Sequence, residues 1–419
     1  MQIKSISVKI ILDSRGKETL EAEFISENFS VTSSVPSGKS TGSHEVFVLE
    51  PKKALEKFTS IKHEILAASG RIKTQREFDK FLIALDGTKN KSHLGGNLIL
   101  VLSLTFARLK AKSQGQELWQ YIQSIQQYNT KTLKHFEFPK PIFNVINGGA
   151  HANNSLSIQE FQVIPTVNDF AIGLSIGKEF YKKLYKILET KFGKENIKMG
   201  DEAGFSAPFK SDEEAVEILN DLIKKNHYPL HIGLDAAATS FYSSAGDLAK
   251  EDNERDIYVV DGREYAAERL EKYYLNLAEH YGIISIEDPF YEEAFKDFSR
   301  MTKSMAKINN NSLIITDDLT TTNHDRLEKA IKEKSGNAIL VKLNQIGTLT
   351  ETLDVVSLAY KNNWKVVVSH RSGETMDNFI ADLAVAVGAW GIKAGAPAKP
   401  ERLAKYDRLL EIYKGKHRI

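Results

Sequence analysis

Five short apolar runs in the second half of the chain each end on a charged residue. The runs read HIGL, IISI, LIIT, AILV and VVVSH, and the residues that follow them are Asp235, Glu287, Asp317, Lys342 and Arg371. A run of four or five apolar residues between polar segments is typical of a buried strand, and the stretches between these runs have helical character. The pattern therefore predicts alternating strands and helices around a parallel sheet.

The order of the charged residues predicts a site. In a (β/α) barrel the carboxyl ends of the strands meet at one mouth, so the three carboxylates, the lysine and the arginine should converge there. Asp235, Glu287 and Asp317 would then form an oxygen-rich site suited to a hard divalent cation such as magnesium. The alternative is that each carboxylate caps the helix after its strand, which is common for one residue but not for three in series.

The first third of the chain follows a different pattern. Residues 2–35 contain three segments, IKSISVKII, ETLEAEFIS and FSVTSSV, separated by turn residues, which predicts an antiparallel meander. The glycine- and serine-rich loop PSGKSTGS follows, and helical periodicity then dominates to about residue 127. A polar stretch marks a boundary near residue 133. We therefore expect an α+β domain over 1–133 and a β/α barrel domain over 134–419.

Within the second domain, two further strands, PIFNVIN and QEFQVIP, should precede the regular alternation. Helical periodicity predicts helices between and after the strands. The expected ranges are 168–192, 212–226, 262–281, 323–335, 349–362 and 376–387, followed by a last helix that begins near Pro400.

Composition narrows the class of protein. The 419 residues are 42% hydrophobic and 26% charged, and 56 Lys and Arg against 55 Asp and Glu leave a net charge of +1, so neither nucleic acid nor an anionic membrane is indicated as a partner. The absence of cysteine excludes disulfides and thiolate metal sites. No segment offers the ~18 uninterrupted apolar residues of a membrane span, and the first residues lack the pattern of a secretory leader. We expect a soluble, cytoplasmic protein.

Eleven strings, spread from residue 13 to about residue 406, occur in the order typical of one family. They read DSRG, PSGKSTG, LDGTKNKSHLGGN, NVINGGAH, SIQEFQVIP, GDEAGFSAP, SIEDPF, DDLTTTN, LVKLNQIGTLTET, VVSHRSGET and IKAGAPAKPERLAKY. Together they resemble enolase, the phosphopyruvate hydratase of glycolysis. The resemblance implies an α/β protein with an enolase-type (β/α)8 barrel behind a smaller α+β domain. It also implies magnesium-dependent, reversible dehydration of a small phosphorylated hydroxy acid, 2-phosphoglycerate, to phosphoenolpyruvate.

The resemblance assigns metal ligands. Asp235, Glu287 and Asp317 match the ligands of a first magnesium ion, and Ser40 matches the loop residue that ligates a second ion once substrate is bound. From composition alone the loop around Ser40 would be only flexible. Its GKST string is not a phosphate-binding P-loop, because Ser33 stands where that motif requires its first glycine.

The resemblance also assigns acid and base roles. Lys342 matches the general base, and positive charge from Lys393 and the metals is expected to lower its pKa so that it can accept a proton. Glu202 matches the general acid that protonates the departing hydroxyl, with Glu160 as its partner. Two carboxyl groups in one enclosed site should keep at least one proton near neutrality.

The remaining matched residues would bind substrate. Lys393 would hold the substrate carboxylate and its enediolate form. Arg371 and Ser372 resemble a phosphate clamp, since a guanidinium fork fits phosphate oxygens in a bidentate way. His370 lines the family's site, and His151 lies on a glycine-rich loop that closes over substrate.

The chain departs from the usual strings of the family at several positions. Lys39 replaces an alanine in the loop, Ala203 replaces a glycine in the acid motif, and Met376 replaces an acid. Glu411 stands where an interface arginine is often found. The resemblance implies a homodimer, and Glu411 would weaken it by repulsion if it faced Glu21 across the interface.

Two other functions stay open at this stage. One is a catalytically impaired enolase-fold binding or scaffold protein, with secondary display at the cell surface. Loss of a metal ligand or of the base would favour it, and neither is lost. The other is a superfamily enzyme that acts on a carboxylate without phosphate, and the HRSGE and GKST strings argue against it.

Overall fold

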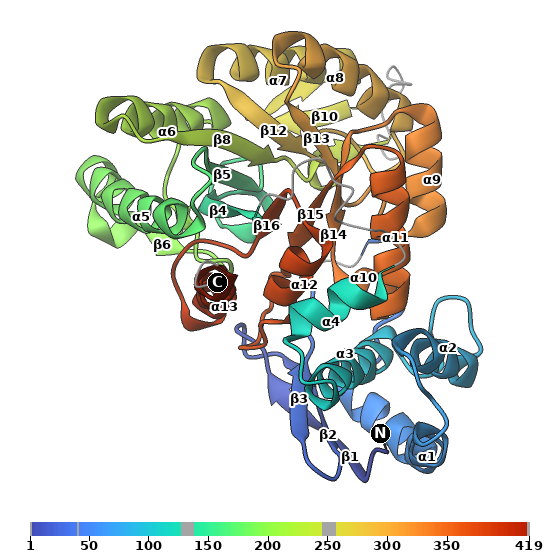
Figure 1. Cartoon of the computed structure of the whole chain (residues 1–419). Helices are drawn as coiled ribbons and strands as arrows, with labels where there is room; N and C mark the ends of the chain where they lie inside the picture. The colour runs from blue at the N-terminus through green and yellow to red at the C-terminus, as the bar shows by residue number, and fades with distance from the viewer. Residues whose placement is uncertain (1, 40–41, 127–137, 245–256, 417–419) are drawn as a thin grey trace.

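The computed structural model describes residues 2–39, 42–126, 138–244 and 257–416. Figure 1 shows a smaller N-terminal body, coloured blue to teal, beside a larger barrel, coloured green to red. The predicted domain boundary near residue 133 lies outside the described residues.

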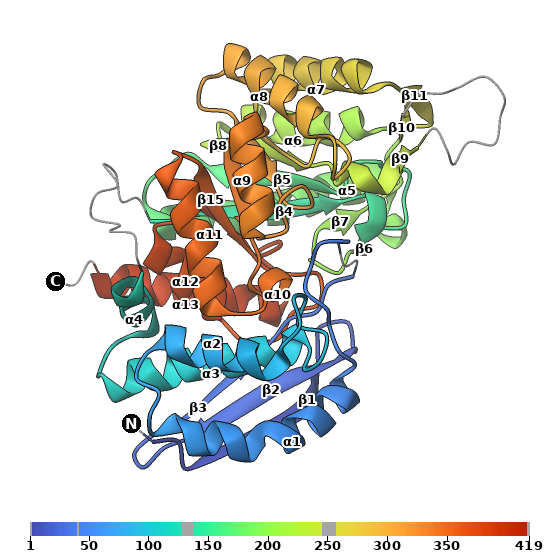
Figure 2. The same cartoon turned by 90° about the vertical axis from the view of Figure 1, so that its right-hand side faces the viewer.

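The N-terminal body begins with the predicted antiparallel meander. Its strands β1 (Ser5–Leu12), β2 (Glu18–Ile25) and β3 (Ser30–Ser34) pair in the order β1-β2-β3. Alternate side chains of this sheet are buried, as a sheet with one face on a core requires. The helices that follow are α1 (Pro51–Ser69), α2 (Gln75–Asp86), α3 (Gly96–Ser113) and α4 (Leu118–Ile125). Figure 2 shows α2 and α3 between the meander and the barrel, which explains why α3 is buried on nearly every side.

Eight strands close the predicted barrel. They are β4 (Lys140–Asn147), β5 (Glu160–Pro165), β8 (Leu230–Asp235), β12 (Ile283–Glu287), β13 (Leu313–Thr316), β14 (Ala338–Val341), β15 (Lys365–Ser369) and β16 (Gly391–Lys393). Pairing between β16 and β4 completes the ring. All five apolar runs that precede a charged residue in the sequence are barrel strands. Their buried apolar residues fill the barrel interior and the layer between the strands and the surrounding helices.

One strand corrects the expectation of a wholly parallel sheet. Strand β5 runs antiparallel to both of its neighbours, β4 and β8. A parallel return needs a crossover helix, and the segment after β4, GGAHANNSLSI, is too rich in glycine, asparagine and serine to form one. Because β5 is reversed, its first residue, Glu160, lies at the mouth where the other strands end.

The helices of the barrel agree with the prediction in most places. They are α5 (Phe170–Phe192), α6 (Asp212–Asn226), α7 (Ala267–Tyr281), α8 (Phe295–Ile308), α9 (His324–Glu333), α10 (Leu343–Ile346), α11 (Leu349–Lys361), α12 (Phe379–Val387) and α13 (Pro400–Lys416). Helix α8 was not predicted, although its four buried residues recur every three or four positions, as one face of a helix requires. No helix of the described part of the chain is long and apolar enough to cross a membrane.

The predicted helix over 262–281 begins five residues late. Strands β10 (Ile257–Val260) and β11 (Arg263–Tyr265) form a hairpin in front of it, and β9 (Tyr242–Ser243) pairs with β10. The turn between β10 and β11 uses left-handed backbone at Asp261 and Gly262. A second small hairpin, β6 (Lys198–Met199) and β7 (Phe205–Ser206), carries the acid motif.

Candidate functional site

A cavity of about 440 Å³ opens at the mouth of the barrel. Of the residues expected in a site, those that line it are His151, Glu160, Glu202, Asp235, Asp317, Lys342, His370, Arg371, Ser372 and Lys393. Glu287 is buried beside the cavity and contacts Lys393. Ser40 lies outside the described residues. Segments more than 200 residues apart therefore meet in one place.

Strand register places three carboxylates side by side. Glu160 pairs with Asp235 across β5 and β8, and Asp235 pairs with Glu287 across β8 and β12. The ammonium group of Lys393 lies among them, 3.3 Å from Glu160, 2.9 Å from Asp235 and 2.9 Å from Glu287. Burial alone would lower the pKa of Lys393, but the three carboxylates outweigh it and raise that pKa well above its usual value. Lys393 is therefore cationic.

The same crowding acts on the carboxyl groups. Burial, and next the charge of Asp235, raise the pKa of Glu287 well above its ordinary value. Hard oxygen donors that are buried together and repel one another are the donor set that a divalent cation stabilises. Asp235 and Glu287 fit a metal ion on this ground.

Asp317 and Lys342 form an ion pair at the ends of β13 and β14. The Lys342 ammonium donates to Oδ2 of Asp317, and the amide of Gln345 donates to Oδ1 at 2.9 Å. Burial lowers the pKa of Lys342, and Arg371 and Lys393 act in the same direction, but Asp317 prevails and raises it above the ordinary value. The Asp317 carboxylate lies closer to Lys342 than the other cations do, and the lowering expected from Lys393 together with bound metals stays a prediction.

Asp288 and Asp318 were missed by the sequence reasoning. Asp288 accepts from the backbone amides of Asp317, at 3.0 Å, and Asp318, at 2.7 Å, so it holds the end of β13 in place. Ligand atoms of these three aspartates lie within 4.8 Å of one another. Of the three predicted ligands, only Asp317 belongs to such a compact group among the described residues. The sequence signal that could have identified Asp288 and Asp318 is that each directly follows a predicted metal ligand, in the pairs Glu287-Asp288 and Asp317-Asp318.

The acid motif faces two histidines. The hairpin of β6 and β7 presents Glu202, whose carboxylate accepts from the Asn144 amide at 2.9 Å. His151 Nδ1 lies 3.6 Å from Glu202 and 3.8 Å from Glu160, and His370 Nε2 lies 3.5 Å from Glu202. Both histidines and both carboxyl groups are thus in one cluster, whereas the sequence analysis paired only the two glutamates.

The two glutamates of this cluster titrate in opposite directions. Burial, with the neighbouring Glu202 and Asp235 charges, raises the pKa of Glu160 well above its usual range despite Lys393. Burial would also raise the pKa of Glu202, but His151 and His370 overcome it and hold that pKa well below its usual range. Because the two carboxyl groups titrate together, a proton that they hold belongs to the pair.

His370 is held in one tautomer. Arg402 donates to its Nδ1, and because a guanidinium can only donate, the ring hydrogen must sit on Nε2, which faces Glu202. Burial lowers the pKa of His370 to about 4, so the ring is neutral near pH 7. Burial lowers the pKa of His151 as well.

Arg371 meets a carboxylate that the sequence reasoning did not single out. Glu45, from the segment after the glycine-rich loop, accepts from both ends of the guanidinium at 2.9 and 3.2 Å, and Asn344 accepts at 3.1 Å. The hydroxyl of Ser372 accepts from Arg15 of the DSRG motif at 3.1 Å. Residues of the N-terminal body therefore complete the mouth of the barrel.

Lys39 joins three segments around the cavity. Its ammonium donates to the carbonyl of Ala150 at 2.7 Å and lies 3.8 Å from the Asp201 carboxylate. These partners are neighbours of His151 and Glu202 in the chain. The part of the mouth that carries His151, Glu160 and Glu202 is called the acid side below. The departure from the usual alanine thus adds a cation and a hydrogen-bonded contact on this acid side.

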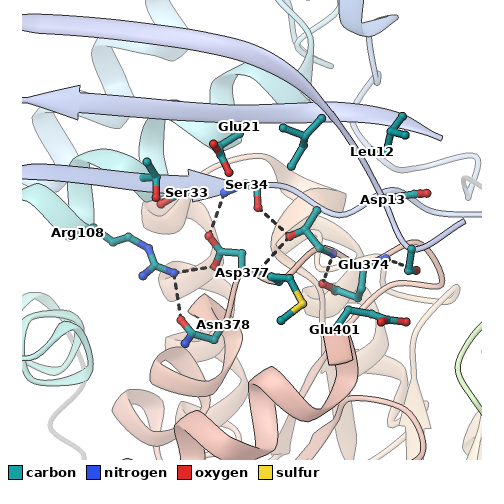
Figure 3. Close-up of a pocket in the computed structure, with 15 residues that line it drawn as sticks. Leu12, Asp13, Glu21, Ser33, Ser34, Arg108, Glu374, Asp377, Asn378 and Glu401 are labelled. Atoms are coloured by element: carbon teal, nitrogen blue, oxygen red, sulfur yellow. Dashed lines mark hydrogen bonds and ion pairs between the residues drawn. The ribbon is translucent and has the colours of Figure 1, made fainter. Parts of the chain in front are cut away.

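A second cavity, of about 510 Å³, lies between the meander and the loop after β15 (Figure 3). Arg108 donates to Asp377 at 2.7 Å, and Asp377 accepts from the Ser34 amide at 2.9 Å, so this loop is fastened to the N-terminal body. Leu12 and Met376, on its rim, are 63% and 61% exposed. None of the described residues predicted for the chemical site lines it.

Comparison with known proteins covers nearly the whole chain. A family model described as "Enolase, C-terminal TIM barrel domain" matches residues 135–416, and one described as "Enolase, N-terminal domain" matches residues 3–122. A protein named "Enolase" from Methanocaldococcus jannaschii is 41% identical over 98% of this chain and 95% of its own length. Proteins of the same name from Methanococcoides burtonii and Methanococcus maripaludis are 41% and 39% identical, each over 98% of this chain and 94% of their length.

Proposed function

The chain belongs to the enolase family, and from this premise we propose that the mouth of its barrel reversibly dehydrates 2-phosphoglycerate to phosphoenolpyruvate in glycolysis. It is a lyase, a phosphopyruvate hydratase. The observation that best supports the site assignment is the position of Lys342 and Glu160 around the ring. Strands β14 and β5 are four strands apart in either direction, so Lys342 and Glu160 lie on opposite sides of the mouth.

This arrangement suits an elimination from two faces of the substrate. Lys342 would take the proton from the carbon next to the substrate carboxylate, and because it must be neutral to do so, its ion pair with Asp317 has to open in the reacting complex. On the opposite side, the pair of Glu160 and Glu202 would deliver its one proton to the departing hydroxyl, which leaves as water. Neutral His151 and His370 would orient Glu202 by hydrogen bonds.

Substrate charge would be held by the cations of the mouth. Lys393 would bind the substrate carboxylate, which develops further negative charge as the enediolate forms. Arg371 and Ser372 would bind the phosphate. Because Glu45 already uses both ends of the Arg371 guanidinium, phosphate would have to share that fork or displace the carboxylate.

Enolases are in general metal-dependent, and the acidic groups of this mouth can bind a metal. We propose two magnesium ions, the first on Asp235, Glu287 and Asp317 and the second on Ser40 with substrate present. When bound, they would supply the positive charge that neutralises the doubly charged intermediate. The part of the mouth that carries Asp235, Glu287, Asp317 and Lys342 is called the cation side below. Its buried carboxylate oxygens are the structural support for this proposal.

We further propose a cytoplasmic homodimer that needs no nucleic acid. The exposed Leu12 and Met376 around the second cavity offer apolar side chains to a second copy. Glu411 is bonded within its own chain to Arg408 at 3.3 Å, and Glu21 to Lys9 at 2.7 Å, which offsets part of the expected repulsion. Sedimentation should give a dimer at micromolar concentration, tighter in mild acid if the repulsion persists. A monomer would overturn this part of the proposal.

The activity itself is tested by following the ultraviolet absorbance of the enol product. Purified protein with 2-phosphoglycerate and magnesium should form phosphoenolpyruvate, excess chelator should stop the reaction, and added magnesium should restore it. Calcium should bind but support turnover poorly, because its larger and looser shell misplaces the carboxylate. Full activity in excess chelator would remove the metal assignment, and no activity with magnesium would favour a binding or scaffold role.

A further inference from the structure

A buried chain of hydrogen bonds connects the backbone of Lys342 to the carboxylate of Asp317 through Thr322 and Gln345. We propose that Gln345, oriented by Thr322, is a positioning residue that holds Asp317 ready for a divalent cation. The inference rests on the proposed function, because Asp317 is a metal ligand only under that proposal.

The contacts are short and continuous. The backbone amide of Lys342 donates to Oγ1 of Thr322 at 2.9 Å, and that hydroxyl donates to Oε1 of Gln345 at 2.6 Å. The amide nitrogen of Gln345 then donates to Oδ1 of Asp317 at 2.9 Å. Thr322 is 0% exposed and Gln345 is 1% exposed, so water does not compete for these groups.

The direction of each hydrogen bond follows from the carboxylate end. The ionised carboxylate of Asp317 can only accept, so the NH2 group of Gln345 must point at it and the amide cannot flip. The carbonyl of Gln345 is then left for the Thr322 hydroxyl, which donates to it and accepts from the backbone N–H of Lys342. The Asp317 carboxylate is therefore oriented by the Gln345 amide, which is itself oriented by Thr322.

The two oxygens of Asp317 consequently have different partners. Oδ1 is held by the neutral amide of Gln345, whereas Oδ2 contacts the charged ammonium of Lys342. The neutral donor fixes Oδ1 without adding a positive charge of its own, and the charge of the carboxylate is balanced at Oδ2 by Lys342. Groups that orient a metal ligand in this way commonly change metal affinity about 10- to 100-fold when they are removed.

The backbone at Thr322 is an independent sign that this contact matters. Thr321 and Thr322 have φ values of 46° and 51°, in the left-handed region that β-branched residues rarely adopt. Both residues are fully buried. Strained backbone persists where the surrounding structure requires a particular side-chain position, and here it carries the hydroxyl to the point between Lys342 and Gln345.

Magnesium binding, measured by calorimetric titration with magnesium chloride in the absence of substrate, tests the inference without reference to turnover. Gln345→Leu should weaken magnesium binding about 10- to 100-fold. The matched control is Gln75→Leu, because Gln75 is also buried and donates through its amide to a buried aspartate, Asp79, at 2.9 Å, in the N-terminal body. Both variants should lose thermal stability, but only the first should lose magnesium affinity.

Two further variants keep the inference testable if Gln345→Leu does not fold. Thr322→Val removes the hydroxyl and should weaken magnesium binding, whereas Thr322→Ser keeps the hydroxyl and should bind as the unaltered protein does. The inference would be overturned if folded Gln345→Leu bound magnesium as tightly as the unaltered protein. It would also be overturned if Thr322→Val and Thr322→Ser bound magnesium equally well. Neither result would affect the proposed function. If the unaltered protein does not bind magnesium, the metal assignment itself fails and the inference fails with it.

Discussion

The two sides of the barrel mouth stabilise buried carboxyl groups in different ways. On the acid side, burial and neighbouring carboxylates raise the pKa of Glu160, and two histidines flank Glu202. On the cation side, Asp317 is held by the Lys342 ammonium and Asp235 by that of Lys393. The same chemical group therefore meets histidines and another carboxyl on one side and lysine ammonium groups on the other. Environment, not residue type, separates the two sides.

The two sides also differ in how the chain builds them. The cation side is made of residues at the carboxyl ends of parallel strands, each of which follows its own apolar run. The acid side combines the first residue of the reversed strand β5, a glycine-rich turn with His151, and a hairpin with Glu202. A side built from turns depends more on contacts between residues that are far apart in the sequence.

The largest effect should come from removing the base or the acid. Lys342→Ala should abolish both turnover and exchange of the substrate's carbon-2 proton with deuterated solvent, because neither begins without proton removal. Glu202→Gln should lose turnover but keep exchange, since the base remains and only the departure of the hydroxyl is blocked. Each loss of turnover should be about 10²- to 10⁴-fold. Proton exchange is read by nuclear magnetic resonance and turnover by absorbance.

The assigned roles would be wrong if Lys342→Ala kept near-normal exchange. They would also be wrong if Glu202→Gln kept near-normal turnover. Either result would break the contrast between a cation side that removes a proton and an acid side that supplies one, even in an active enolase.

A smaller, pH-dependent effect is expected beneath the acid side. Oδ1 of Asp212 accepts from the amides of Ser157, at 3.0 Å, and Ile158, at 3.2 Å, in the segment that leads to Glu160. Burial, and next the charge of Asp261, raise the pKa of Asp212 to about 8. Because this folded-state pKa lies above the unfolded value of 3.8, the native state binds the proton more tightly and stability falls as pH rises between those values.

Asp212→Asn removes that dependence and keeps the carbonyl oxygen that accepts the two amides. Its gain in melting temperature over the unaltered protein should be near zero at pH 4 and should grow up to about pH 8. Asp221→Asn, on the same helix α6 but exposed, is the control and should show no such trend. A gain that is constant across this pH range would contradict the assigned ionisation of Asp212.

The smallest effect should come from Lys39. This side chain is 46% exposed, and an exposed ion pair contributes at most about 1 kcal/mol, which corresponds to a ~5-fold change. Lys39→Ala should raise KM for 2-phosphoglycerate by up to that factor, with the difference shrinking at high salt. Lys39→Arg keeps the charge and should stay close to the unaltered protein. A change in kcat alone, independent of salt, would show that Lys39 acts on the chemistry and not on binding.

Much of the cation side could be predicted from the sequence because the relevant information is local. An apolar run identifies a strand, the next charged residue identifies its end, and parallel strands bring their ends together regardless of the intervening segments. Asp235, Glu287, Asp317 and Lys342 were located in this way, and the antiparallel meander was predicted by the same alternation. The ordered motifs then identified the enolase family, which the comparisons confirmed.

Only the tertiary structure decided how those groups are paired and charged. The reversal of β5, the Glu45 carboxylate on Arg371 and the support that Asp288 gives to Asp317 all join residues that no local pattern connects. The raised pKa values of Glu160 and Lys342 depend on which charges lie nearest in space. A sequence pattern determines which residues end a strand, but burial and through-space charge determine what those residues do there.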